Sequence, residues 1–204
     1  MPSVSLVWML MCLPLLAARD DGSIVVSLHG SSRRGGNSKS AALKHVEFCL
    51  GCADPRAEGS HVWALAPRFG LHDFSVVGGV ALAVPNDAAT DLLNAVDLAG
   101  RVVLVERGRV SIMDKIVRAQ AAGAVAVIVV DNGACDDEFA DCGRSGGKEQ
   151  GGFAYRDDPR AWEAVKVPAV LVTAANGERL QSLMDLQSVN VASLGAQLVA
   201  RRQR

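Results

Sequence analysis

The sequence predicts an α/β fold, and three stretches of the chain indicate it. Short runs that favour strands occupy residues 61–85, a strand, helix and strand pattern spans residues 101–130, and a second strand and helix follow from residue 168. With 204 residues, half of them hydrophobic, the chain can bury one ordinary globular core. One domain is therefore expected.

The amino terminus is predicted to be a signal peptide over residues 1–18. An apolar run extends from about Val4 to Ala18, which suits a secretory signal and is shorter than the ~20 residues of a membrane-spanning helix. Two features fit less well, because no Lys or Arg precedes the run and Leu16 stands where a small residue is preferred if cleavage follows Ala18. The mature chain is expected to have no membrane span and to be secreted or to lie in the lumen of the secretory pathway.

Removal of the signal would leave four cysteines, which are Cys49, Cys52, Cys135 and Cys142. An even number in an oxidising compartment predicts disulfides. Four cysteines allow three connectivities, and the short loops favour Cys49 with Cys52 and Cys135 with Cys142. Thiol-redox chemistry at "CLGC" is the alternative, but it needs the first thiol at a helix N-terminus, and the surrounding residues indicate a loop.

Residues 19–59 are predicted to be an irregular N-terminal extension, because they include the polar stretch "GSSRRGGNSKS". "HVWALA" from residue 61 and "FSVVGGVALAVP" from residue 74 are short strand candidates, with Gly78 and Gly79 expected to interrupt the second at a turn or bulge. "RVVLV" from residue 101 is a β-branched run typical of a buried strand.

A helix is predicted to begin after Ser111. Ser111 can cap it, with Asp114 three residues on in a variant of the capping box, and Gly123 suits its end. Asp114 and Lys115 are expected to be cap and surface residues. The apolar "AVAVIVV" that follows predicts a second strand, parallel to the first and buried.

A further strand and helix are predicted near the end of the chain. "PAVLVT" opens at Pro168, and "AANGERLQSLMDL" has an apolar helical face on Leu180, Leu183 and Met184. "SVNVASL" can return as a strand.

Neither nucleotides nor nucleic acids are expected as ligands. The turn "ERGRVS" has one glycine where a dinucleotide fingerprint needs three, and Lys148 follows Gly147 without the rest of a P-loop. The net charge is −1, and the basic residues are scattered apart from the tail "RRQR". The chain therefore has no broad cationic surface for phosphates.

The acidic stretch "DNGACDDEFADC", residues 131–142, does not follow the spacing of an EF-hand. Counted from Asp131, the sixth residue is Asp136 rather than glycine and the twelfth is Cys142 rather than glutamate. A solvated acidic loop is favoured over an irregular calcium site.

No catalytic residue, metal or cofactor is predicted. Ser145 lies in "GRSGG", which resembles a nucleophile elbow, but an acidic loop precedes it where a strand is required. Cys49, Cys52, His61 and His72 could be written as a zinc set, but their spacing fits no common finger.

The central block "LAGRVVLVERGRVSIMDKIVRAQAAGAVAVIVVDN" resembles the protease-associated (PA) domain family. The opening segment of the family is similar to "RFGLHDFSVVGGVALAVPND", which precedes this block. Its closing segment is similar to "VKVPAVLVTAANGERL", which follows the block. The resemblance implies a PA-like domain over residues 60–192 with an inserted loop at 132–166, followed by a tail at 193–204. It also implies short strands in a barrel-like or sandwiched sheet with two to three flanking helices.

The chain departs from the family at two positions. Many members carry a cysteine pair at positions that match Ala89 and Val110 here. Both cysteines are missing together, so neither leaves an odd thiol.

The resemblance implies a non-catalytic accessory module that binds proteins or peptides, of the kind found in or beside peptidases, sorting receptors and membrane-anchored ubiquitin ligases. By analogy the contact region would comprise the "RG" turn, the helix start and the inserted loop. The expected contact residues are Arg107, Arg109, Asp136, Asp137, Phe139 and Trp162. Trp162 could equally cover the core.

Two alternatives stay open. One is a regulatory PA domain fragment of a larger peptidase or sorting receptor. The other is a small thiol-redox or metal-binding protein that uses Cys49 and Cys52 or the acidic loop.

Overall fold

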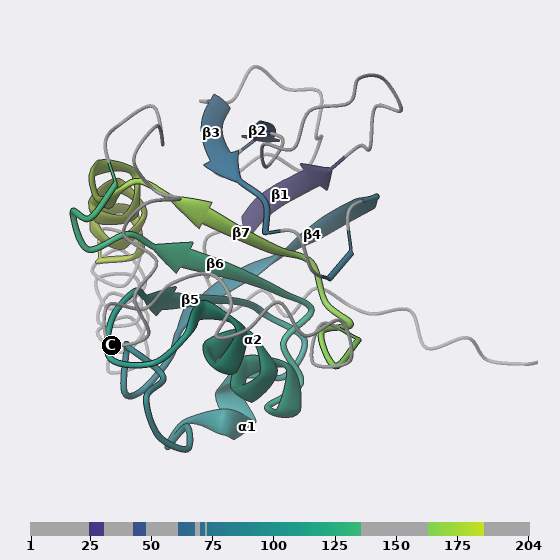
Figure 1. Ribbon diagram of the computed structural model, residues 1–204, viewed down its shortest axis with the longest axis vertical. Coiled ribbons are helices and arrows are strands. Elements are labelled where there is room, and N and C mark those ends of the chain that lie inside the picture. Colours follow the sequence, from purple (N-terminus) through teal and green to yellow (C-terminus); the bar gives the residue numbers. More distant parts are fainter. Residues whose placement is uncertain are drawn as a thin grey trace, which may run out of the picture.

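A seven-stranded mixed sheet organises the computed structural model, which describes residues 25–30, 43–47, 61–67, 70–71, 73–135 and 163–185 (Figure 1). Its four middle strands are parallel neighbours, in the order β4, β5, β6 and β7. They span Phe74–Leu82, Val102–Glu106, Ala126–Val130 and Ala169–Val172. β5, β6 and β7 are buried along almost their whole length, which explains their continuous apolar sequences.

Three antiparallel strands extend the sheet at its two edges. β1 (Val25–Gly30) pairs with β4, while β3 (His61–Leu65) pairs with β7 and with β2 (Leu43–Glu47). β1 and β2 also lie against each other, so the sheet curls toward closure. The predicted mixed α/β fold with a barrel-like sheet is confirmed.

Two strands lie in the part of the chain, residues 19–59, that was expected to be irregular. β1 carries the β-branched and apolar run "VVSLHG", which pairs over its whole length with β4. The polar stretch between β1 and β2 dominates the composition of this region, so composition alone did not predict either strand. The sheet therefore begins before the expected domain start at residue 60.

β4 is one continuous strand, so the expected interruption at Gly78 and Gly79 is wrong. Both glycines pair in register with β1, opposite Val26 and Val25. A Cβ atom at Gly78 would lie 3.3 Å from Val102 Cγ2, which is tighter than ordinary van der Waals contact. Glycine here makes room for the neighbouring strand instead of ending the strand.

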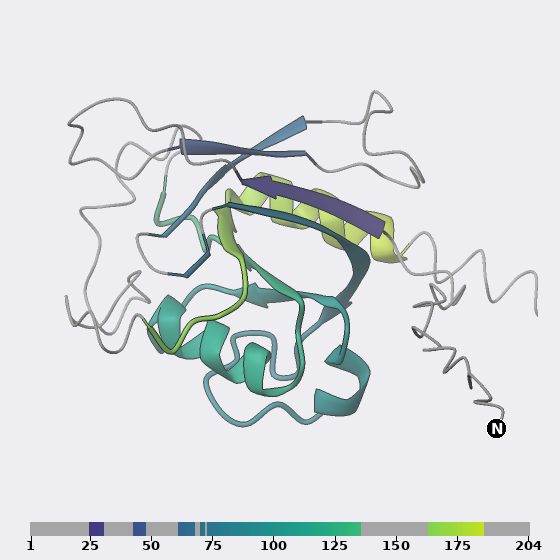
Figure 2. The same cartoon turned by 90° about the vertical axis from the view of Figure 1, so that its right-hand side faces the viewer.

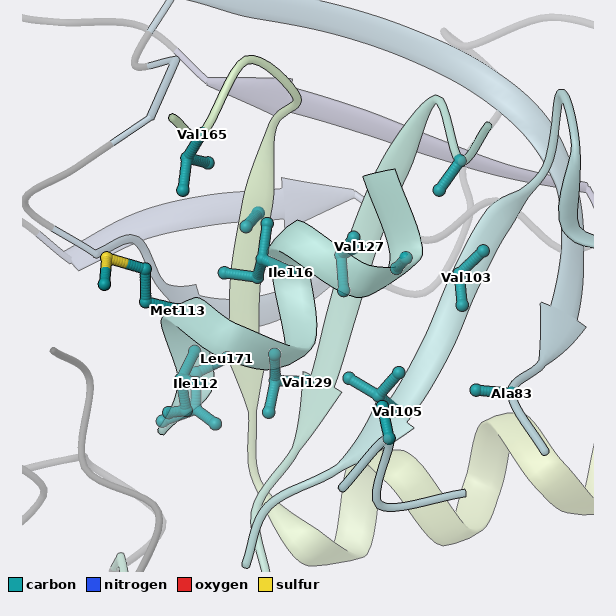
Figure 3. Close-up of a cluster of buried hydrophobic side chains, with 14 of the residues drawn as sticks. Ala83, Val103, Val105, Ile112, Met113, Ile116, Val127, Val129, Val165 and Leu171 are labelled. Carbon is teal, nitrogen blue, oxygen red and sulfur yellow. The ribbon is translucent and has the colours of Figure 1, made fainter. Parts of the chain in front are cut away.

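The sheet separates two apolar cores. On one face, α2 (Ile112–Ala121) and the short α1 (Ala95–Leu98) pack against alternate residues of β5, β6 and β7 (Figures 2 and 3). Alternate residues of a strand point to opposite faces, so the remaining strand residues form the second core with β1 and the helix at residues 174–185. The result is a layer of helices, a sheet, and a mixed layer on the other side.

The start and end of α2 follow the sequence prediction. The Asp114 N–H donates to Ser111 Oγ at 3.1 Å, and the Ser111 hydroxyl donates to Asp114 Oδ2 at 2.7 Å. Gly123 follows the helix with φ +86°, a conformation that favours glycine. The predicted parallel strand, helix and strand unit is confirmed.

The predicted closing strand and helix are also confirmed. Leu180 is buried, and Leu183 and Met184 pack against the same core. Gly177 lies against Val130, whose side chain occupies the space that a Cβ atom would need. The expected strand "SVNVASL" lies outside the described residues.

Candidate functional site

Three loops meet at the carboxyl edge of the parallel strands. They are residues 83–94 after β4, residues 107–111 after β5, and the beginning of the insertion after β6, residues 131–135. In sheets with parallel strands, ligands commonly bind at the carboxyl ends of the strands. The "RG" turn and the first residues of the inserted loop, 132–135, both expected in the contact region, lie at this edge.

Arg107 is enclosed at the end of β5. Its guanidinium Nη1 lies 2.7 Å from Asp131 Oδ1, and both side chains are fully buried. The pairing follows from the strand register, because Glu106 and Val130 are opposite each other in β5 and β6 and each charged residue is the next in its chain. This position corrects the expectation that Arg107 belongs to a contact surface: its side chain anchors the loops from inside.

Asp131 also fixes the start of the insertion. Its Oδ2 accepts hydrogen bonds from the N–H groups of Gly133 at 2.8 Å and Cys135 at 2.9 Å. Arg107 Nη1 reaches Cys135 Sγ at 3.0 Å. Cys135 is disulfide-bonded, and its partner lies outside the described residues, so the pairing with Cys142 stays a prediction.

Arg109 has the opposite environment. It is the central residue of a γ-turn, in which the Val110 N–H donates to the Gly108 carbonyl at 2.7 Å, and its φ is +58°. Its side chain is 77% exposed and donates to Asp87 Oδ2 at 3.1 Å. A non-glycine residue in this region of φ is uncommon, so the backbone at this exposed arginine is strained.

Two side chains of α2 hold the loop that carries Asp87. Lys115 Nζ donates to the Asp87 carbonyl, and Arg118 Nη1 donates to the Ala88 carbonyl at 2.8 Å. Ala88 has φ +45°, so the loop is both strained and tightly bonded. The Ala89 N–H donates to Asp87 Oδ1 at 3.1 Å, which orients the carboxylate toward Arg109.

Lys115 is fully buried, so the expectation that it lies on the surface is wrong. Helical spacing carried the signal, because Lys115 is three residues after Ile112 and four before Ala119, both on the buried face. Burial lowers the pKa of Lys115 to about 8, although the nearby Asp87 carboxylate opposes this change.

The pKa of Asp87 is lowered. Burial alone would raise this pKa, but the Ala89 N–H and the charges of Arg109 and Lys115 together outweigh burial.

The positions that match the family's cysteine pair lie in the two segments that these contacts join. Ala89 follows Asp87 in the loop after β4, and Val110 follows Arg109 in the "RG" turn. The ion pair between Arg109 and Asp87 therefore connects, without a covalent bond, the same two segments that a disulfide between these positions would connect.

The remaining predicted residues are not described by the structure. These are Asp136, Asp137, Phe139, Trp162, Cys49, Cys52 and Cys142. In the described part of the chain, no group of three or more His, Cys, Asp or Glu side chains is arranged to hold a metal ion. Nor is any helix within that part long and apolar enough to cross a membrane.

Comparisons with known proteins agree with the family resemblance. A family model of the PA domain matches residues 67–180. A PRADC1-like protein of Drosophila melanogaster is 41% identical over 87 residues, which are 41% of this chain and 44% of that protein. The matched part is therefore less than half of that relative.

Two solved structures are also similar. A zinc aminopeptidase from Bacillus subtilis is 16% identical, with a TM-score of 0.43 over 77% of this chain and 30% of its own. An aminopeptidase from Aneurinibacillus sp. strain AM-1 is 19% identical, with a TM-score of 0.38 over 80% of this chain and 30% of its own. Similarities of this size carry no conclusion about activity.

Proposed function

The chain belongs to the PA domain family, and from this premise we propose that it is a non-catalytic module that recognises a protein or peptide through the carboxyl edge of its parallel strands. The contact region includes Arg109, the loop with Asp87, and the inserted loop with Asp136, Asp137 and Phe139. Trp162 would contribute from the end of the insertion.

This proposal rests on one observation: Arg109 has a strained backbone conformation and an exposed side chain. Residues kept at positive φ without being glycine cluster at sites where their orientation is used. A planar guanidinium that is mostly exposed can make paired hydrogen bonds with a carboxylate or with peptide carbonyls. The surrounding loops are held by buried and partly buried hydrogen bonds, which lowers the ordering cost of binding.

We further propose that the protein works outside the cell or in the lumen of the secretory pathway. The apolar amino terminus and the even number of remaining cysteines support this location. The disulfide at Cys135 supports it too, because disulfides persist in oxidising compartments.

Binding can be tested by panning the purified chain against a random peptide library and titrating an enriched peptide into isotope-labelled protein. The expected result is a set of amide shifts in residues 83–94 and 107–111, with little change in the helix at residues 174–185. Shifts confined to that helix, or the absence of any enriched peptide, would count against the proposed surface.

Intact mass measured after alkylation without a reductant separates this proposal from its thiol alternative. Unmodified cysteines in a chain that lacks about 18 N-terminal residues are expected. Alkylation of Cys49 and Cys52 would favour a thiol-redox or metal-binding protein instead.

A further inference from the structure

A second surface beside the carboxyl edge carries large apolar side chains that the core does not use. It consists of Leu82, Val84, Leu93 and Val96, here called the α1 patch. Leu93 is 83% exposed and Val96 is 90% exposed, and the other two are also exposed. Isolated apolar residues are normal on a protein surface, but four that come from two neighbouring segments indicate an interaction surface.

Backbone hydrogen bonds bring the two segments of the α1 patch together. The Leu93 N–H donates to the Val84 carbonyl at 2.7 Å. The side-chain amide of Asn94 then bridges the strand end, since its Nδ2 donates to the Leu82 carbonyl at 2.8 Å and its Oδ1 accepts from the Val84 N–H at 2.9 Å. Leu82 and Val84 flank the buried Ala83, so they share the outward face.

The fold does not require Leu93 and Val96 for its own core. Leu98 is fully buried, and Leu92 packs against the core that lies under α2. These two leucines attach the segment to the molecule, and α1 lies at its periphery beside α2 (Figures 1 and 2). Leu93 and Val96 are therefore available to a partner.

The charged side chains within residues 82–100 are all acidic, namely Asp87, Asp91 and Asp97. Basic side chains contact this segment at Asp87 and Ala88. Asp87 pairs with Arg109, whereas the exposed Asp91 and Asp97 have no ion-pair partner within the described residues. Free carboxylates around apolar side chains favour a partner with basic residues, and they disfavour both an anionic membrane and a second copy of the same surface.

We propose that the α1 patch docks a protein segment in which apolar side chains are flanked by lysine or arginine, such as a basic amphipathic helix. The apolar side chains of that segment cover Leu93 and Val96, and its basic residues pair with Asp91 and Asp97. Asp91 and Leu93 lie in the loop at residues 83–94, which the proposed function also uses. Val96 and Asp97 lie outside that loop in α1, so variants at these two positions test the α1 patch separately.

The probe is a short synthetic peptide with leucine and lysine at helical spacing, titrated into the labelled full chain and followed by amide shifts. Shifts in residues 95–98 are expected, without shifts in residues 107–111, which belong to the contact region of the proposed function. Val96→Asp should weaken binding roughly tenfold, and Asp91→Asn with Asp97→Asn roughly fivefold. Val77→Asp, at another exposed valine, and Glu178→Gln, at another exposed carboxylate, should change the affinity little.

Several outcomes would overturn this proposal. One is equal binding of a matched leucine and glutamate peptide, and another is equal loss of affinity in the Val77→Asp control. Binding that occurs only after residues 193–204 are deleted would mean that the chain's own basic tail covers the patch. A wild-type dimer that Val96→Asp makes monomeric, seen by sedimentation, would mean that a second copy covers it.

Discussion

Arg107 and Arg109 are separated by one glycine in the same turn, yet the structure uses them in opposite ways. Arg107 is buried against Asp131 and joins the ends of β5 and β6, whereas Arg109 is exposed and pairs with Asp87 at the surface. The turn "RGR" therefore contains a buried anchor, Arg107, and an exposed arginine, Arg109, and these two arginines cannot substitute for each other.

The largest effect is expected from Asp131→Ala. This change leaves the buried guanidinium of Arg107 without its carboxylate and two N–H groups without their acceptor. A loss of about 3–5 kcal/mol in the free energy of unfolding is expected, measured by urea denaturation. Asp91→Ala, which removes an exposed aspartate, is the control, and equal stability of the two variants would contradict the role of the anchor.

Lys115→Met should have an intermediate effect. It removes a donor to the Asp87 carbonyl from below the loop, so a loss of about 1 kcal/mol is expected near neutral pH. Binding at the carboxyl edge should weaken as well, because the loop loses a support. A variant with unchanged stability and unchanged amide shifts in residues 83–90 would show that the lysine does not hold the loop.

The pH dependence of the free energy of unfolding provides a second test of the role of Lys115. The pKa of Lys115 is about 8 in the folded chain and ordinarily 10.5. Between pH 8 and pH 10.5, the unfolded chain therefore binds more protons than the folded chain. Stability contributed by Lys115 should therefore rise as the pH increases from 8 to 10.5. The free energy of unfolding of the wild type, measured relative to Lys115→Met, should increase over this window; a constant difference would mean that the pKa is not lowered.

The smallest effect on stability is expected from Arg109→Gly. Glycine accepts φ +58° without strain, which is a gain. It also increases the conformational freedom of the unfolded chain and removes an exposed ion pair that contributes little, so the two losses and the gain nearly cancel. The free energy of unfolding should stay within about 1 kcal/mol of the wild type in urea denaturation. A much larger loss would mean that Arg109, like Arg107, is an internal support.

Periodicity predicted the parts of the fold in which burial is regular. The strand, helix and strand unit around α2 was predictable because its strands are continuously apolar and Ser111 caps the helix with a local hydrogen bond. β1 was missed because a polar stretch follows it and dominates the composition of residues 19–59. The burial of Lys115 had a signal in its helical spacing, which its charge obscured.

The site was harder to predict than the fold. The pairing of Arg107 with Asp131 depends on the register of β5 and β6, which composition does not give. The position of Arg109 depends on one backbone angle. Both arginines have the same local sequence signal, and only long-range pairing distinguishes them.

The most direct test of recognition by Arg109 is the affinity of a library-selected peptide for Arg109→Gly, compared with the wild type. Arg179→Gly, at an exposed arginine on the helix at residues 174–185, is the control. We expect roughly tenfold weaker binding by Arg109→Gly, with stability nearly unchanged and the control close to the wild type. An unchanged dissociation constant for Arg109→Gly would contradict the claim that this strained arginine is displayed for recognition.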